Sequence, residues 1–427
     1  MPALFELTAL VLVVTAGACW LNARLLRLPL AVGLLLIGLG LTLVVAAVDR
    51  LAPGLAYGAA FGGLLARIDY PALVLNVLLA YLLFAGAMNV NLGALRQRGW
   101  AVAILATLGT LITAGIVGLG FYGLAHMVGI AMPLSWALVF GVLISPTDPI
   151  AVLAMTKRTA LQEELRAQLE GEALFNDGVA VVLFRAALAY AVGSGADHLS
   201  LSGLSSHALI EAGGGAVVGL AGGVFAMAVI RAVDDWATET LVTLATATAV
   251  YALALHLHWS GPIGVVVAGL VAGSDWAGRG MSRRTVDHLH PFWRMVDEGM
   301  NAVLFLLLGL KAWELRLDPA ALILAVAAPL LILAARWIAM ALPTALLPLV
   351  KRRGSLALVN VLTWAGVRGG LSAAMALSLP EGPWRQPIVA ATFGVVIFSI
   401  VVQSMTMERL ALKTGYGEPR PEPEPYC

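Results

Sequence analysis

Acidic side chains lie inside two apolar stretches of this 427-residue chain. The first stretch contains Asp148, within the run Ser-Pro-Thr-Asp-Pro, and the second contains Glu172 and Asp177. A carboxylate in a segment long enough to cross a bilayer is costly, and such residues commonly bind a cation or carry a proton. These three residues are therefore the first candidates for a site that handles positive charge.

Two prolines interrupt the first stretch. Pro146 and Pro149 each lack an amide hydrogen and clash with the carbonyl four residues earlier, so a continuous helix through them is not expected. Within a bilayer the freed carbonyls need another partner, and a dehydrated cation near Thr147 and Asp148 is one such partner. The alternative is a plain kink, in which Asp148 caps a restarted helix that has Pro149 in its first turn.

The second stretch places its polar residues on different faces of one helix. Glu172 and Asn176 are four residues apart and share a face, whereas Asp177 lies about 140° round the helix from Glu172. Glu172 needs a cationic partner, and both Arg336 and Arg368 are candidates. A buried carboxylate beside arginine stays ionised, while a carboxyl group in an apolar cavity near another acid can exchange protons. We therefore expect Glu172 to be a fixed charge and Asp177 to be the exchanging group; the alternative is an Asp177 that serves packing alone.

The composition predicts a polytopic membrane protein. Apolar residues make up 60% of the chain, charged residues 12%, and the mean hydropathy is +0.91, whereas soluble domains hold about 25% charged residues. The net charge of +1 is spread over short loops without a basic stripe, which excludes a nucleic-acid partner. The sequence has no metal-ligand spacing, nucleophile elbow or P-loop pattern. It therefore predicts neither an enzyme nor a cofactor.

Windows of roughly 17 to 25 apolar residues are long enough to span a bilayer. Thirteen such windows are expected, at about 4–20, 29–48, 71–88, 100–124, 132–155, 169–193, 207–232, 238–257, 259–273, 292–310, 320–349, 357–379 and 387–405. With the N-terminus outside, eighteen of the 26 basic residues fall on the cytoplasmic side, five outside and three within spans. We expect one transmembrane domain over residues 1–410 of a multi-pass protein of the cell (inner) membrane. A short Pro/Glu-rich cytoplasmic tail, 411–427, is predicted to be disordered.

An odd number of spans fits two inverted six-helix repeats joined by one further helix, a common plan of secondary transporters. Pairing each span with the seventh after it matches the fifth window with the twelfth. The fifth contains Pro146 and Pro149, and the twelfth contains Gly369 and Gly370 next to Arg368. Corresponding breaks in two halves indicate a binding site near the middle of the membrane.

Taken together, these residues resemble a known family. The pattern Thr147-Asp148-Pro149, then Glu172 and Asn176-Asp177 in the next span, then Arg336 and Arg368-Gly369-Gly370 is similar to the monovalent cation/proton antiporters. The resemblance is to the electroneutral sodium/proton exchanger branch, which has bacterial NhaP-like members, and it covers essentially the whole membrane chain.

The resemblance implies an all-α antiporter fold. It has thirteen transmembrane helices, two broken helices that cross near the ion site, and a core part that moves like an elevator against a dimerisation part. The resemblance also implies that Asp177 is the exchanging carboxylate, preceded by Asn176, and that Asp148 and Thr147 help to bind Na⁺ or another monovalent cation. Glu172 would pair with Arg336. The Asn before Asp177 implies one proton per cation, hence electroneutral exchange, and the family plan implies a homodimer in membrane lipid.

Two positions depart from the family pattern. Ala85 follows Phe84 where many relatives have an acid, and Ala173 follows Glu172 where many have serine. Both changes remove oxygen atoms that could bind an ion, so they bear on ion preference and affinity.

The expected function is therefore exchange of Na⁺, Li⁺ or K⁺ for H⁺, with a part in pH homeostasis. The alternative is a transporter of the same inverted-repeat architecture that carries an organic solute with sodium. A site for an organic anion should offer basic or neutral groups where the broken helices cross, and Asp148 with Asp177 argues against that alternative.

Overall fold

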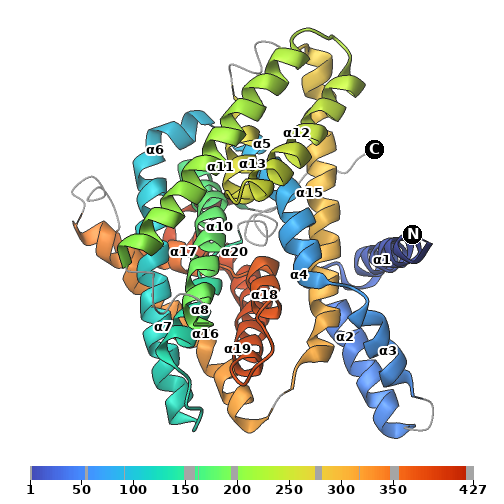
Figure 1. Ribbon diagram of the computed structural model, residues 1–427, viewed down its shortest axis with the longest axis vertical. Coiled ribbons are helices and arrows are strands. Elements are labelled where there is room, and N and C mark those ends of the chain that lie inside the picture. The colour runs from blue at the N-terminus through green and yellow to red at the C-terminus, as the bar shows by residue number, and fades with distance from the viewer. Residues whose placement is uncertain are drawn as a thin grey trace.

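The protein is described here by a computed structural model (Figure 1). The structure describes residues 2–52, 56–90, 92–148, 159–161, 163–193, 201–274, 281–316, 318–346 and 355–419. Within these residues it is helical apart from one pair of short strands. Apolar side chains from nearly every helix form one contiguous core.

The α-helices, in chain order, are α1 (Pro2–Leu21), α2 (Leu30–Leu51), α3 (Tyr57–Ala66), α4 (Tyr70–Leu73), α5 (Leu79–Asn89), α6 (Leu92–Ile104), α7 (Thr110–Met127), α8 (Leu134–Leu143), α10 (Glu163–Ala191), α11 (Leu201–Ile230), α12 (Trp236–His256), α13 (Gly261–Ala272), α15 (Arg283–Lys311), α16 (Pro319–Leu346), α17 (Ser355–Trp364), α18 (Gly370–Leu377), α19 (Arg385–Phe398) and α20 (Ser404–Thr414). Short helical turns of other types extend or join some of them, namely η1 (Asn22–Leu26), η3 (Val74–Leu78), η4 (Leu105–Gly109), η5 (Ala312–Glu314) and η7 (Ser399–Gln403).

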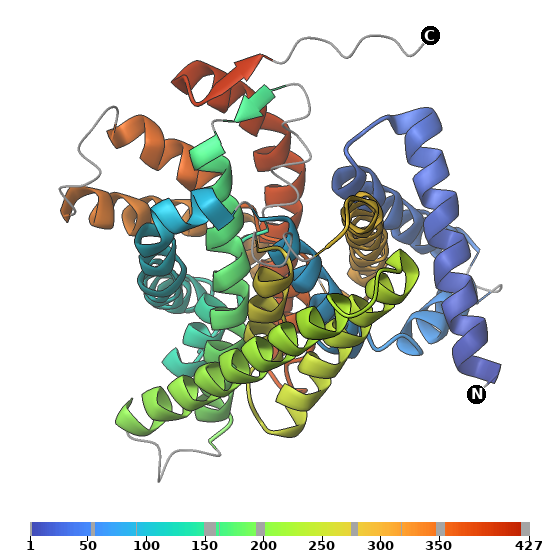
Figure 2. The same cartoon turned by 90° about the horizontal axis from the view of Figure 1, so that it is seen from above.

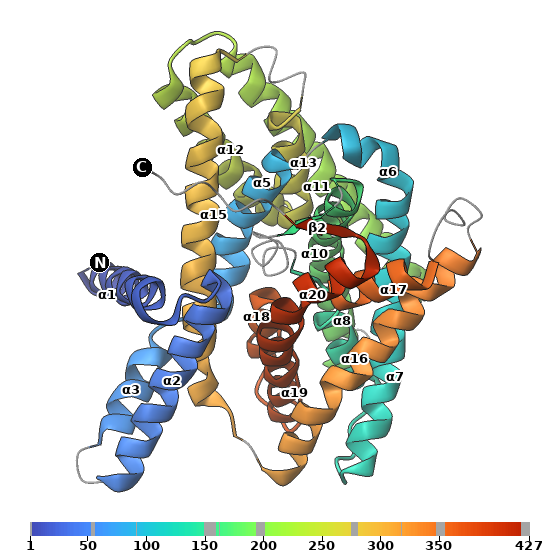
Figure 3. The ribbon, with the colours of Figure 1, turned by 180° about the vertical axis from the view of Figure 1, so that it is seen from behind.

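The helices pack as two groups. In one group α15 packs on α2 and α5, and α13 packs on α5, α11 and α12. In the other, α8 packs on α7 and α10, and α16 packs on α7, α17 and α19. Figures 1 and 3 show α1, α2 and α3 at one edge of the molecule and α7, α16 and α17 at the opposite edge. Contacts of α10 with α5, α11 and α13, and of α18 with α15, join the two groups.

Each predicted window overlaps helical residues, and nine helices within the described ranges are long and apolar enough to cross a membrane. The total of thirteen spans stays a prediction. One helix was not predicted: α3 lies between the second and third windows and is separated from α4 by a turn. Asp69 ends that turn, because its carboxylate accepts a hydrogen bond of 3.0 Å from the Ala72 amide and so caps α4.

The tail begins later than expected. Helix α20 continues to Thr414, and the strand β2 (Gly417–Pro419) pairs antiparallel with β1 (Thr159–Leu161), with Ala160 opposite Glu418. The disorder predicted from 411 therefore does not hold for these residues, because residues 411–414 belong to α20 and Gly417–Pro419 pair with β1. Residues 420–427 lie outside the described part of the chain.

Candidate functional site

The first polar stretch forms the end of a helix. Helix α8 stops at Leu143, and residues 145–148 continue without helical structure. Ser145, Pro146 and Thr147 are buried in this segment, while Asp148 is half-buried. The helix ends one turn before Asp148, as expected for a run in which proline interrupts the hydrogen-bond pattern. Pro149 lies outside the described residues.

The second break is the gap between α17 and α18. Helix α17 ends at Trp364, and α18 begins at Gly370 after an extended Gly369. Gly369 lies so close to Asp148 that a side chain there would overlap the Asp148 carboxylate. Glycine at this position therefore permits the close approach of the two broken segments.

Backbone and guanidinium hydrogen bonds join the two breaks. The Asp148 amide donates to the Val367 carbonyl over 2.7 Å. The fully buried Arg368 donates from Nη1 to the carbonyls of Pro146, at 2.8 Å, and Ser145. Carbonyls of the non-helical segment that follows α8 thus accept hydrogen bonds from an arginine of the opposite segment. From the sequence, a dehydrated cation was one expected partner of these carbonyls.

Asn176 fixes the first broken segment from the side of α10. Its Nδ2 donates to Thr147 Oγ1 over 2.8 Å, and its Oδ1 accepts from the Thr147 amide over 3.3 Å. Both residues are buried. The Asn176 amide therefore holds Thr147, one residue before Asp148, in a fixed orientation.

Glu172 pairs with Arg336 and not with the other candidate, Arg368. Arg336 Nη2 lies 2.7 Å from Glu172 Oε1, and the two side chains are only 4% and 2% exposed. Arg336 Nε also donates to the Leu362 carbonyl in α17 over 3.2 Å. The ion pair therefore connects α10, α16 and α17 behind the second break.

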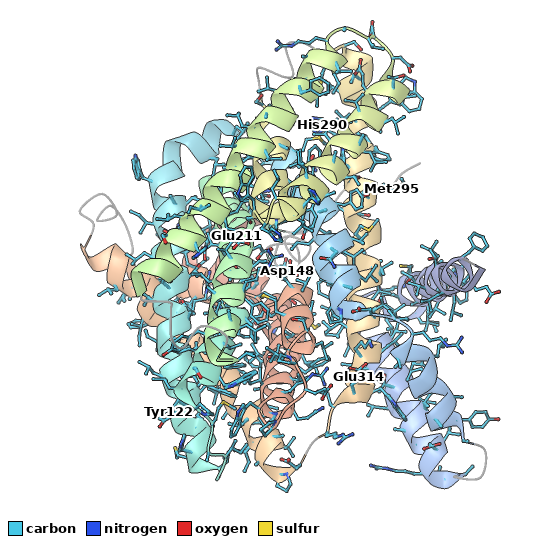
Figure 4. All side chains as sticks on the ribbon, viewed as in Figure 1. Tyr122, Asp148, Glu211, His290, Met295 and Glu314 are labelled. Atoms are coloured by element: carbon cyan, nitrogen blue, oxygen red, sulfur yellow. The ribbon has the colours of Figure 1, made fainter. Side chains whose placement is uncertain are left out.

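A cavity of about 340 Å³ opens where these elements meet. Asp148 and Asp177 both line it, together with Thr147, Pro146, Gly369 and Gly370. Figure 4 shows Asp148 near the middle of the molecule. Asp177 is half-buried at this cavity, one residue after Asn176 and on a different face of α10 from Glu172. Two carboxylates therefore face one enclosed space at the crossing of two broken helices.

The cavity also has an acidic residue that the sequence reasoning missed. Asp297 of α15 lines it together with Asn301, and Asn301 Nδ2 donates to the Asp297 carboxylate over 3.2 Å and to its carbonyl over 2.9 Å. An Asp and an Asn four residues apart in the tenth apolar window were a usable signal. That window contains Gly299 and Gly309 but not the closely spaced prolines or glycines that directed attention to the fifth and twelfth.

Both alanines that depart from the family pattern line the cavity. Ala85 of α5 and Ala173 of α10 are there, and each is almost fully buried. A larger polar side chain at either position would face the same space as Asp148 and Asp177. These two positions therefore make part of the cavity wall apolar.

Comparison with known proteins gives a consistent result. Residues 10–413 match the family described as sodium/hydrogen exchanger, transmembrane. The chain is 36% identical to the Na⁺/H⁺ antiporter NhaP of Pseudomonas aeruginosa, over 97% of this chain and 98% of that protein. It is 35% identical to the Na⁺/H⁺ antiporter NhaH of Halobacillus dabanensis, over 81% of this chain and 84% of that protein.

The fold is similar to that of a solved antiporter. The structure of MjNhaP1, a sodium proton antiporter from Methanocaldococcus jannaschii, superposes with a TM-score of 0.72. The alignment covers 97% of this chain and 99% of that one, at 20% sequence identity. The architecture is therefore that of a known transporter structure.

The buried ion pair predicts a strong effect on stability. Arg336→Met leaves Glu172 ionised and unpaired in the interior, which destabilises a protein by about 3–5 kcal/mol. Arg185→Met is the matched control, because Arg185 pairs with Glu211 at 2.9 Å but is 46% exposed, and exposed pairs contribute less than about 1 kcal/mol. Thermal unfolding in detergent should show a much larger drop for Arg336→Met, and Arg336→Met with Glu172→Leu should recover much of it. Equal drops for the two arginine variants would contradict the structural role of the pair.

Proposed function

This chain belongs to the sodium/hydrogen exchanger family, whose members are secondary transporters and not enzymes, and we propose that it exchanges a monovalent cation for H⁺ by alternating access. The observation that carries the proposal is the cavity shared by Asp148 and Asp177 at the contact of the two helix breaks. The cation is Na⁺ or Li⁺, with K⁺ as a further candidate.

Competition for one site couples the two ion flows. A carboxylate in a confined cavity beside a second carboxylate is stabilised by either a proton or a cation. In this proposal Asp177 binds one or the other, and the Asp148 carboxylate and the Thr147 oxygens complete the cation site. Asn176 holds Thr147 in place, and Gly369 and Gly370 line the cavity from the second broken segment. No covalent chemistry is required.

Competition for a single carboxylate supports electroneutral exchange. In this proposal Asp177 carries one negative charge when it is ionised. One Na⁺ or one H⁺ neutralises it equally, so both loaded forms carry the same charge across the membrane.

The position of the cavity supports an elevator movement. Its walls come from α5 and α15 in one helix group and from α10 and α18 in the other. Sliding one group past the other would carry Asp148 and Asp177 between the two sides. Arg166 and Arg294 also line the cavity, and the predicted topology puts both on the cytoplasmic side. Thirteen spans over residues 1–410, inverted repeats, an outer N-terminus and a cytoplasmic C-terminus in the inner membrane complete the proposal.

A homodimer through the N-terminal helix is part of the same proposal. Helix α1 lies at the edge of the molecule in Figure 2. It exposes large apolar side chains, including Phe5 at 77%, Val13 at 69% and Trp20 at 66%. These side chains meet either lipid or a second copy of the chain in the membrane.

Proteoliposomes test the exchange. Na⁺, Li⁺ and K⁺ should be tested separately for cation-driven proton release, with wild type and the isosteric Asp177→Asn. We expect release with at least one ion and its loss in the variant, because the amide cannot exchange a proton. Gel filtration and thermal unfolding control for folding. Release that persists in Asp177→Asn would contradict the assignment of this residue. No release with any ion in folded wild type would favour the sodium-coupled organic-solute alternative.

Asp297 should affect apparent cation affinity more than turnover. It adds negative charge to the cavity from α15, so Asp297→Asn should raise the KM for Na⁺ about three- to tenfold, the effect expected of one nearby charge at intermediate dielectric. The neighbouring Glu298→Gln is the matched control, because Glu298 is exposed and is not among the residues that line the cavity. Concentration series in proteoliposomes separate KM from turnover. A similar KM in both variants would show that Asp297 does not act on the transported ion.

A further inference from the structure

A second hollow lies away from the cavity that contains Asp148 and Asp177. Helices α16, α17 and α20 enclose a groove of about 620 Å³, and Figure 3 shows these three helices close together on one side of the molecule. Leu333 and Trp337 of α16 line it, as do Trp364 at the end of α17 and Leu410 of α20. We call it the α16–α20 groove. Most of its wall is apolar.

Positive charge is concentrated at one wall of this groove. Arg409 and Lys413 of α20 both line it, and both are exposed. They are four residues apart and therefore lie on one face of the helix. Glu408 precedes Arg409 but is not among the residues that line the groove. The groove thus offers two adjacent cations to a ligand.

Thr363 provides a second and independent indication of a ligand. It lines the groove and is only 6% exposed, yet its hydroxyl has no hydrogen-bond partner within the described residues. The nearby indole N–H groups donate to other acceptors: Trp337 donates to Asn360 over 3.1 Å, and Trp364 donates to Thr406 over 2.8 Å. A buried hydroxyl without a partner is unfavourable unless a ligand or water completes it.

The combination of groups fits a lipid better than a free anion. The charged groups sit on α20, at the end of a long apolar helical segment, while the apolar wall continues along α16, itself a candidate span. Tryptophans are typical of the membrane interface, and basic pockets on the cytoplasmic side bind anionic headgroups. A soluble phosphate would use the cations and leave the apolar wall exposed to water.

We propose that the α16–α20 groove binds an anionic phospholipid of the cytoplasmic leaflet. The phosphate contacts Arg409, Lys413 and the Thr363 hydroxyl, and an acyl chain lies along Leu333 and Trp337. This inference goes beyond ion exchange and does not depend on it. A bound lipid would hold α16, α17 and α20 together.

The groove adjoins the ion pair and the second break, which gives the lipid a structural consequence. Trp337 follows Arg336 directly, and Thr363 follows Leu362, whose carbonyl accepts the Arg336 Nε hydrogen bond. The Trp364 carbonyl, at the end of α17, accepts a hydrogen bond of 3.2 Å from Gln403. Lipid in the groove should therefore raise the thermal stability of the helices that carry the site.

Native mass spectrometry and thermal unfolding of the delipidated, detergent-purified chain test the proposal. Three probes are added separately: phosphatidylglycerol, phosphatidylcholine and inorganic phosphate. Wild type should retain phosphatidylglycerol preferentially and unfold at a higher temperature with it. Arg409→Gln with Lys413→Gln should weaken that binding about 25-fold, at about fivefold for each basic residue. Thr363→Val should weaken it severalfold without a change in net charge, and Thr363→Ser should restore it.

A matched charge control separates the groove from general attraction. Arg24→Gln with Arg27→Gln removes two exposed basic residues that the predicted topology places on the same side, far along the chain from α20. This control should bind phosphatidylglycerol as wild type does. Equal losses in both double variants, or equal binding of the two lipids, would overturn the proposal. Protection by inorganic phosphate as strong as by phosphatidylglycerol would also overturn it, in favour of a small-anion site. If the double variant fails to fold, Thr363→Val and Thr363→Ser test the proposal: phosphatidylglycerol binding equal to wild type in Thr363→Val would overturn it.

Discussion

The contact between two broken helices is the constraint on which the rest of this structure depends. A helix that ends inside a membrane protein leaves carbonyl groups without donors, and lipid cannot supply them. Here Arg368 donates to the carbonyls of Ser145 and Pro146, while the Asp148 amide donates to Val367. Each break thus satisfies backbone atoms of the other. These hydrogen bonds hold the two broken segments together beside the cavity that Asp148 and Asp177 line.

Buried charge is expensive, so the fixed charges around the site need compensation of their own. Glu172 and Arg336 compensate each other at 2.7 Å, which also links α10 to α16. Removing one partner leaves an unpaired ion, and that penalty exceeds the value of the pair itself. The Asn176 amide positions Thr147 without adding charge. The proposed exchange fills the site at Asp177 alternately with a proton and a cation. The α16–α20 groove adjoins the arginine that pairs with Glu172, because Trp337, which lines the groove, follows Arg336.

Sequence patterns anticipated the parts of this arrangement that depend on covalent geometry. Pro146 and Pro149 indicated a broken helix before Asp148, and the glycines beside Arg368 indicated its counterpart, because both residue types act on the local backbone. Pairs of residues from elements far apart in the chain were harder to predict from the sequence. As arginines, Arg336 and Arg368 were equally suitable partners for Glu172. The packing of the helices places Arg336 beside Glu172, and Arg368 beside the carbonyls of Ser145 and Pro146. Asp297 was missed because its window has only the isolated Gly299 nearby, not closely spaced prolines or glycines. The strand at Gly417–Pro419 depends on residues more than 250 positions earlier, so the composition of the tail could not reveal it.

The central claim is that one site binds a proton or a cation but never both. The most direct measurement is isothermal titration calorimetry of Na⁺ binding to purified protein, at several pH values and in buffers with different ionisation enthalpies. The account predicts release of about one proton per Na⁺ at pH values where the site is protonated, with the Kd for Na⁺ rising about tenfold for each unit of pH decrease in that range. A Kd independent of pH, with no proton released on binding, would contradict it.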